Sequence, residues 1–380
     1  MYKKFHIGIA LIMFVSGFLF AQSQTPWWYT LEEGKRLYSG GAYGNALIAF
    51  EDARRERISR FTRMEQDLIT VMSMPEVRRF GDSLEFIERY IAAHNETAAA
   101  AALAELYYRL PKDSLNGSAN RALEELNRLK NYPEAEFWLG ETYLAEGEPG
   151  LALRQYERAW QNRALLEIPG FDAEILYRIT DILRMRREYQ EMEKWANEII
   201  EGTTPDGLPR DRLWAENRIR AAMARILENE GINRFLTMYR HNNAVTGKAH
   251  RFLGFFCYSS NRYSLAAEHL MFAFLIQNTV IIEEAQRRQY DFTFTTLNDL
   301  MAFARSRPEL LAYLEETEYY RTAYYLASSL YAAGKTRPSR ELWAFLAGSS
   351  GENSAGNAGE WGTRARRSPD PVVERTILTP

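Results

Sequence analysis

A spacing of small and bulky residues, found three times along the chain, most limits what this sequence can fold into. Each copy has a glycine, a larger residue three positions later, eight intervening residues, and then an alanine, a bulky residue and a second alanine. Identical spacing in separate places predicts copies of one structural unit. The copies are Gly34, Leu37, Ala46, Phe50 and Ala53; Gly140, Tyr143, Ala152, Tyr156 and Ala159; and Gly254, Cys257, Ala266, Leu270 and Ala273.

Two helices joined by a short turn account for this spacing. A glycine on the first helix lets the backbone of the second approach closely, and the residue three positions later lies on the same helical face. On the second helix, the bulky residue inserts between the two helices. We therefore expect a set of packing positions: Gly34, Ala46, Phe50, Gly140, Ala152, Tyr156, Gly254, Ala266 and Leu270.

The remainder of the chain also indicates helices. Recurring strand patterns bounded by hairpin turns are missing, and breakers such as Ser39-Gly40-Gly41 separate segments of about 12–16 residues. Short helices with short connections pack as antiparallel neighbours. Two weaker copies of the spacing are Ala327, Leu330, Ser339, Trp343 and Leu346, and Thr180, Leu183, Met192, Ala196 and Ile199.

The pattern resembles the tetratricopeptide repeat, a helix–turn–helix unit of about 34 residues. The resemblance implies an all-α fold, a right-handed superhelical solenoid of antiparallel helix pairs, over residues 22–347. A unit of this kind cannot bury its apolar face alone, so each one stacks on the next. The resemblance further implies a groove that binds other proteins, as an extended peptide or a partner helix.

Positions that line the groove in that family carry aromatic and charged residues here. Tyr, Trp and Arg are the residue types that most often anchor protein interfaces. Burial against neighbouring helices is the alternative for each of them. The candidate groove residues are Trp28, Lys35, Tyr38, Phe137, Glu141, Lys248, Arg251, Tyr258, Arg321, Tyr324 and Tyr331.

The first 21 residues have the features of an export signal. Lys3 and Lys4 precede an apolar stretch from Ile7 to Phe20, and Ala21 ends a plausible cleavage site. An uncleaved membrane anchor is the alternative, although the stretch is shorter than the roughly 20 residues of a spanning helix. Since Cys257 is the only cysteine, no internal disulfide can form. These features predict a bacterial periplasmic protein with no membrane span after cleavage.

Composition changes after the last repeat copy. Residues 348–362 are rich in Gly, Ser, Asn and Ala, and the segment cannot bury enough apolar surface to become ordered, so we expect residues 348–380 to form a disordered tail. Trp361 and the arginines beside it are either a short docking motif or part of a solvated tail.

Sequence motifs for catalysis, cofactors or metals are missing. The segment from Ala333 to Thr336 resembles the end of a phosphate-binding loop, but Ser329 stands where that motif needs glycine. No His-Glu-x-x-His occurs, and we expect His94, His241, His250 and His269 to be solvated or at the core edge. With a net charge of −3 and interspersed signs, the chain lacks the basic face of a nucleic-acid binder.

These observations predict a non-catalytic protein–protein interaction scaffold of the cell envelope. Two alternatives remain open at this point: a structural subunit of a large envelope machine, such as a secretion, outer-membrane assembly or periplasmic flagellar complex, and an accessory domain of a cell-wall enzyme. A small-molecule-binding solenoid is a further possibility, for which the sequence offers no pocket signature.

Overall fold

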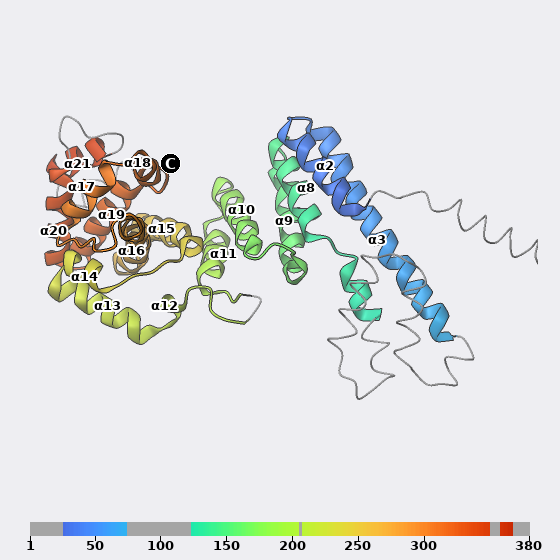
Figure 1. The fold of residues 1–380 in the computed structure, drawn as a ribbon, viewed down its shortest axis with the longest axis horizontal. Coiled ribbons are helices and arrows are strands. Elements are labelled where there is room, and N and C mark those ends of the chain that lie inside the picture. Colours follow the sequence, from blue (N-terminus) through green and yellow to red (C-terminus); the bar gives the residue numbers. More distant parts are fainter. Residues whose placement is uncertain (1–25, 74–122, 205–206, 350–357, 368–380) are drawn as a thin grey trace, which may run out of the picture. The chain divides into compact units, whose positions relative to one another are not determined.

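The described part of the chain is all-helical. The computed structural model describes residues 26–73, 123–204, 207–349 and 358–367 (Figure 1). Within these ranges there is no β-strand, and the single isolated bridge joins Thr203 to Pro209. The expected export signal at 1–21, the segment 76–110 and His94 lie outside the described residues. The all-α class is therefore established for the described ranges.

The chain divides into two compact units, Met1–Ile175 and Leu176–Pro380. In the first, α2 packs against α3 and α8 against α9, and α3 also contacts α8. Its core includes Phe61, Leu126 and Leu139 beside the repeat positions. The elements are α2 (Trp27–Ser39), α3 (Tyr43–Ser73), α8 (Pro133–Ala145), α9 (Pro149–Gln161), the 3-10 turn η1 (Arg163–Leu165) and the start of α10 (Phe171–Met185).

The second unit contains two further helix hairpins, α15/α16 and α19/α20, and α16 packs against α19 (Figure 1). Helix α11 contacts α15, and α13 contacts α20. Its elements after α10 are α11 (Tyr189–Glu201), α12 (Arg212–Ala215), α13 (Asn217–Glu230), α14 (Ile232–Met238), α15 (Ala244–Ser259), α16 (Tyr263–Arg288), α17 (Leu297–Arg305), α18 (Pro308–Glu316), α19 (Tyr319–Ala332), α20 (Thr336–Gly348) and α21 (Ala358–Arg367).

Each repeat glycine faces the bulky residue sixteen positions later. A Cβ added at Gly34 would lie 2.5 Å from the Phe50 ring, and one at Gly140 would lie 2.6 Å from the Tyr156 ring. A Cβ at Gly254 would collide with the Leu270 side chain. The ring or branched chain thus occupies the space that any larger residue would need, which is the close approach that the spacing predicts.

The turns of the hairpins share one backbone geometry. Seven positions after each small residue the chain has a positive φ: 77° at Gly41, 85° at Gly147, 63° at Arg187, 60° at Asn261 and 78° at Gly334. In every case the next amide donates to the carbonyl five positions back, at 2.8–2.9 Å, as Glu148 does to Tyr143. Capping hydrogen bonds of this kind satisfy carbonyl groups that have no partner within the helix. The two weaker sequence copies therefore have the same turn as the three strong ones.

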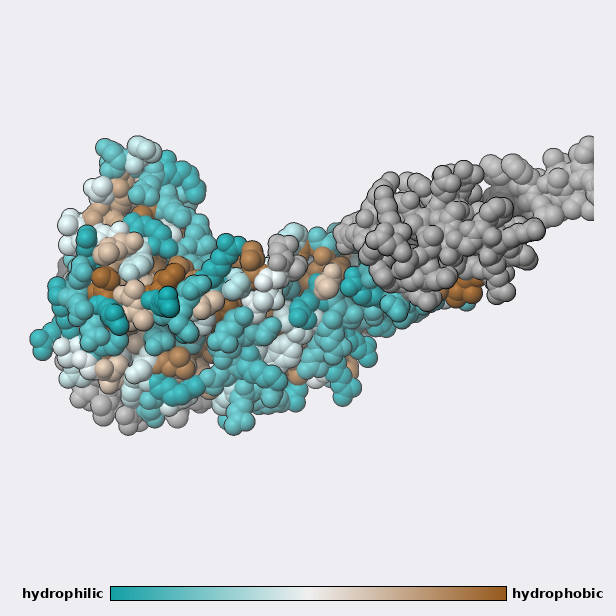
Figure 2. Space-filling view, turned by 90° about the horizontal axis from the view of Figure 1, so that it is seen from below, coloured by the Kyte–Doolittle hydropathy of each residue, from teal (hydrophilic) through white to brown (hydrophobic). Residues whose placement is uncertain are grey.

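Helices α3 and α16 are longer than the expected 12–16 residues, with 31 and 26 residues. No glycine or proline interrupts either helix after its first turn, so nothing stops the helix at the end of the repeat. By length and composition α16 could cross a membrane, but 83% of its apolar window is buried in the fold. Hydrophilic residues cover most of the coloured surface in Figure 2. We interpret α16 as the core helix of its unit.

The expected disorder of residues 348–380 is wrong for Ala358–Arg367, which form α21. Trp361 is buried there, with its ring 5.2 Å from that of Tyr324 and 5.9 Å from that of Tyr325. The Arg366 guanidinium donates to the Ala347 carbonyl at 2.9 Å. The aromatic side chains of α19 supply the apolar surface that the segment itself lacks. The other tail residues after Ser349 lie outside the described ranges.

Candidate functional site

A pocket on the second unit gathers charged and aromatic side chains from α10, α11, α15 and α19. Its volume is about 410 Å³, within the roughly 300–1,000 Å³ typical of ligand pockets. Lys248, Phe252, Phe255 and Ser259 form one wall, and their spacing places them along a single stripe of α15. One helix face therefore supplies much of the lining.

Helix α15 presents this stripe because its opposite side is fixed in the core. Gly254 lies against Leu270 of α16, and Leu253 and Cys257 are fully buried. This packing sets the rotation of α15 about its axis. The repeat glycine thereby also determines where the pocket side chains of the same helix point.

Asp181 of α10 lies between two cations at one end of the pocket. Its carboxylate is 3.7 Å from the Arg184 guanidinium and 3.9 Å from the Lys248 ammonium. The ammonium also lies 4.5 Å from the ring centre of Tyr177. Both ion pairs are solvent-exposed and longer than hydrogen bonds, so each adds little stability. The two cations remain accessible to a ligand.

Glu318, at the start of α19, also lies between two cations, here the guanidinium groups of two arginines. It accepts a hydrogen bond of 2.5 Å from Arg321 and lies 3.6 Å from Nε of Arg251. Only 15% of the Arg251 side chain is exposed, and burial lowers the pKa of its guanidinium. Arginine stays protonated in proteins, so a nearly buried positive charge lines the pocket.

Aromatic rings form the apolar part of the lining. The Arg321 guanidinium lies 4.5 Å from the ring centre of Phe255, within cation–π range. Phe256 stacks on Tyr189 of α11 with 5.9 Å between ring centroids. The site can therefore accept an anionic group and an apolar side chain together.

Three candidate groove residues, Lys248, Arg251 and Arg321, come together in this pocket. Tyr331 is exposed and does not line it. In the first unit, Trp28 is exposed, while Tyr38 packs its ring 5.5 Å from that of Trp138. Lys35 pairs with Glu32 at 2.7 Å and lies 5.7 Å from the ring centre of the same tryptophan.

Four other candidates are buried, so a groove-lining role is wrong for them. Phe137 packs its ring 4.6 Å from that of Phe171. Tyr258 and Tyr324 are core residues of the second unit. Glu141 is also buried, and it accepts a 2.5 Å hydrogen bond from the hydroxyl of Tyr156. For all four, packing against neighbouring helices is the alternative that holds.

Sequence reasoning missed most of the other pocket residues. Asp181 and Glu318 look like ordinary helix charge, and only the fold places each between two cations. A signal did exist for the aromatic residues: α15 carries Phe252, Phe255 and Phe256 in addition to the residues that its buried face needs. Surplus aromatic residues on one helix indicate a second apolar surface.

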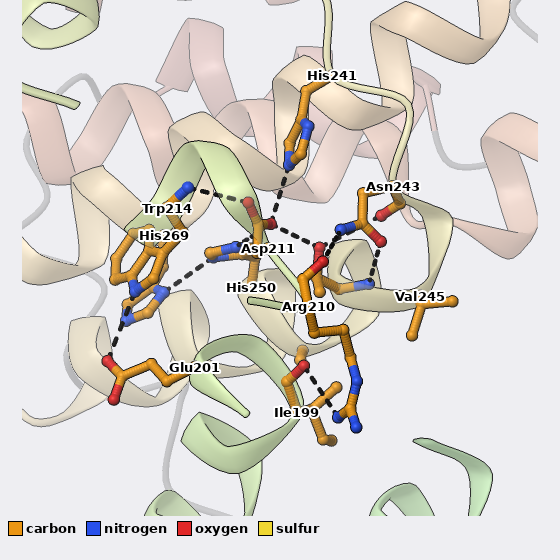
Figure 3. Close-up of polar contacts among 12 residues, drawn as sticks. Ile199, Glu201, Arg210, Asp211, Trp214, His241, Asn243, Val245, His250 and His269 are labelled. Carbon is orange, nitrogen blue, oxygen red and sulfur yellow. Dashed lines mark hydrogen bonds and ion pairs between the residues drawn. The ribbon is translucent and has the colours of Figure 1, made fainter. Parts of the chain in front are cut away.

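A second polar group lies inside this unit, next to α15. We call it the Asp211 cluster; it comprises Asp211, His241, Thr246, His250 and His269 (Figure 3). Asp211 caps α12 by accepting from the Trp214 amide at 2.9 Å. Its other carboxylate oxygen accepts from Nε2 of His241 at 2.9 Å, from Thr246 at 2.7 Å and from Nε2 of His250 at 3.3 Å.

The histidines of the Asp211 cluster are buried, so the expectation of solvated or core-edge side chains is wrong for them. Burial opposes ionisation of Asp211, but the hydrogen bonds from His241 and His250 outweigh it and lower the pKa of the carboxyl. Burial lowers the pKa of both His250 and His269. Among the described residues, no group of His, Cys, Asp and Glu has a geometry suited to holding a metal ion.

Comparison with known proteins gives one distant relative. No family model and no solved structure matches the chain. An uncharacterized protein of Treponema pallidum (strain Nichols) is 23% identical over 321 residues, which cover 84% of this chain and 85% of the relative. Because that span exceeds the length of either unit, the similarity extends over both of them.

Proposed function

We propose that this protein is a non-catalytic binding scaffold whose second unit takes a segment of a partner protein into the pocket. One observation carries the proposal: α10, α15 and α19, which each precede a turn of the shared geometry, direct charged side chains into a single pocket with an aromatic lining. A preformed site on packed helices loses little conformational entropy on binding.

The finer architecture belongs to this proposal as well. We infer a solenoid of tetratricopeptide-like helix pairs, supported by the repeated glycine contacts and by the shared turn geometry of the hairpins. The resemblance implies that the first helix of each pair lines the concave side, and α10, α15 and α19, three of the four helices that supply the pocket, hold that place in the repeat pattern.

Charge indicates what kind of segment fits. The pocket has four cations, Arg184, Lys248, Arg251 and Arg321, against two acids, Asp181 and Glu318, so the cations exceed the acids by two. An acidic segment with an apolar side chain would neutralise the excess and cover the phenylalanines.

The location is proposed from the N-terminal sequence, whose pattern is that of an export signal. We place the protein in a bacterial periplasm. A single stable assembly around the pocket would make it a structural subunit of an envelope machine, whereas several transient clients would make it an adaptor.

A photo-crosslinker at the pocket tests the binding role. Cys257 is buried and its pKa is raised to about 11, so Ser259→Cys offers the only reactive thiol for attaching a benzophenone. Ser259 is exposed and lines the pocket, whereas the exposed Ala222 of α13 does not. Ala222→Cys is therefore the matched control.

We expect the benzophenone at Ser259→Cys to crosslink partner proteins in living cells, and the one at Ala222→Cys to crosslink few or none. Unlabelled protein should compete with the labelled protein for these partners. The same products from both positions would reject the pocket as the binding site. Cleavage of peptidoglycan by the purified protein would reject the non-catalytic role.

A further inference from the structure

The Asp211 cluster connects the pocket helix to the rest of its unit through side chains that can bind protons. Thr246 and His250 lie one turn apart on α15, and both hydrogen-bond the same oxygen of Asp211. Lys248 and Arg251 of the pocket are on the same stretch of this helix. The carboxylate therefore ties the segment of α15 that carries two pocket cations to the start of α12.

The hydrogen bonds of the cluster do not fit a His250–His269 pair in which both rings are charged. His250 uses its Nε2 proton to donate to Asp211, which leaves a lone pair on Nδ1. Nδ1 of His269, on α16, lies 3.0 Å from that atom and is the donor when both rings are neutral. If both rings were charged, both Nδ1 atoms would carry a proton, two N–H groups would lie face to face, and one of the rings would have to move.

No solvent reaches the His250–His269 pair to stabilise an added charge. His250 and His269 are both buried, with the ring of His269 stacked 4.5 Å from that of Trp214 and His250 stacked 5.1 Å from Phe272. A buried ionised ring without a second partner is strongly disfavoured. The His250–His269 pair is thus stable when neutral and unstable when both rings are charged.

Some charged groups around the His250–His269 pair favour its protonation, and others oppose it. The Asp211 carboxylate, at the start of α12, favours a protonated His250 through its hydrogen bond and its negative charge. Arg220 of α13, which lies 4.4 Å from the ring centre of Trp214, and Arg262 at the α15/α16 turn disfavour a further positive charge. His241 shares the carboxylate, and Glu201 of α11 reaches the indole nitrogen of Trp214 at 3.5 Å.

We propose that the Asp211 cluster is an acid-sensitive latch, in which protonation of the His250–His269 pair frees α15 and so displaces the pocket side chains that hold the partner. The latch is a property of the second unit itself. Only its effect on a bound partner rests on the proposed function.

The sign of the effect follows from the proton balance. Burial lowers the pKa of both histidines, so the opened latch takes up protons that the closed latch excludes. The free energy that keeps the latch closed is complete above the ordinary histidine pKa of about 6.5 and is lost as the pH falls below it. Asp211, with its lowered pKa, stays ionised throughout this range.

Hydrogen exchange measured on the full-length protein tests the latch. Between about pH 7.5 and pH 5.5, after correction for intrinsic exchange, protection of α15 should fall by about tenfold or more. Helix α9 of the other unit, which lacks histidine, should not change. The variant His250→Gln with His269→Gln keeps amide donors but removes both titrating rings, and its α15 should be insensitive to pH.

A pH-independent α15 in the wild type, or a double variant that keeps the wild-type response, would overturn the proposal. If the double variant does not fold, imidazole nitrogen NMR of the wild type decides instead. Neutral rings at pH 7, with a change of state that coincides with the loss of α15 protection, support the latch. Charged rings at pH 7 overturn it.

The crosslinker at Ser259→Cys then separates the two proposals. Crosslinking that weakens on acidification in the wild type, but not in the double variant, supports control of binding by the latch. Crosslinking that is unchanged while α15 loosens rejects that control and leaves the binding role intact. No crosslinking at any pH rejects the binding role, and the exchange data still decide whether the latch exists.

Discussion

Replacing Gly140 by alanine should destabilise the first unit, even though alanine is the better helix former. In an unstrained helix the change gains about 1 kcal/mol. Here the new Cβ would lie 2.6–2.9 Å from three atoms of the Tyr156 ring, which is fully buried. Overpacking of a core costs about 1–3 kcal/mol, and the rigid ring places this site near the upper value. We expect a net loss of about 2 kcal/mol.

The Tyr156 ring has little freedom to move away from a Cβ at position 140. Its hydroxyl donates to the buried Glu141 at 2.5 Å, and its centroid lies 5.5 Å from that of Phe137. Gly150→Ala is the matched control because it also lies in a helix, α9, and a Cβ there meets nothing within 4 Å. That variant should be unchanged or more stable by up to about 1 kcal/mol.

Urea unfolding followed by circular dichroism, with hydrogen exchange of α8 and α9, measures both effects. A second cycle in the Tyr156→Ala background isolates the contact, because the penalty of Gly140→Ala should vanish once the ring is gone. A Gly140→Ala protein as stable as the wild type would refute the close-approach reasoning. So would an equal loss from Gly150→Ala.

Three further predictions follow from single side chains. Trp361→Ala should release α21, with complete loss of its amide protection and about 3–5 kcal/mol of docking energy, while the exposed Thr363→Ala should not. The Cys257 thiol, buried and with its pKa raised to about 11, should resist maleimide at pH 8 until urea is added. Arg187→Gly should raise the unfolding free energy by about 0.5–1 kcal/mol, since φ is 63° there, whereas Asn261→Gly should raise it less.

The hairpins were predictable because their information is local. A glycine and the side chain that fills its space are sixteen positions apart, so the spacing is visible along the chain. The turn was only partly visible: Gly41 and Gly147 are obvious candidates for positive φ, but Arg187 is not. Its conformation is imposed by the two helices on either side.

The candidate site was less predictable because its residues are distant in sequence. Lys248 and Arg251 were identified by their repeat position, but their carboxylate partners come from other helices. Phe137 and Tyr324 occupy equivalent repeat positions and are buried, because a neighbouring aromatic residue packs on each. Residue type at a repeat position therefore does not reveal what packs against it. The Asp211 cluster unites residues from 211 to 269, which no short motif could show.

Helix α21 determines where the packing of the second unit stops. It rests on both α19 and α20 and covers Tyr324 and Tyr325 with Trp361. Left bare, these tyrosines would form an exposed aromatic patch, the kind of surface through which protein molecules associate. A ten-residue segment poor in apolar side chains thereby shields aromatic surface that would otherwise be open to a second molecule.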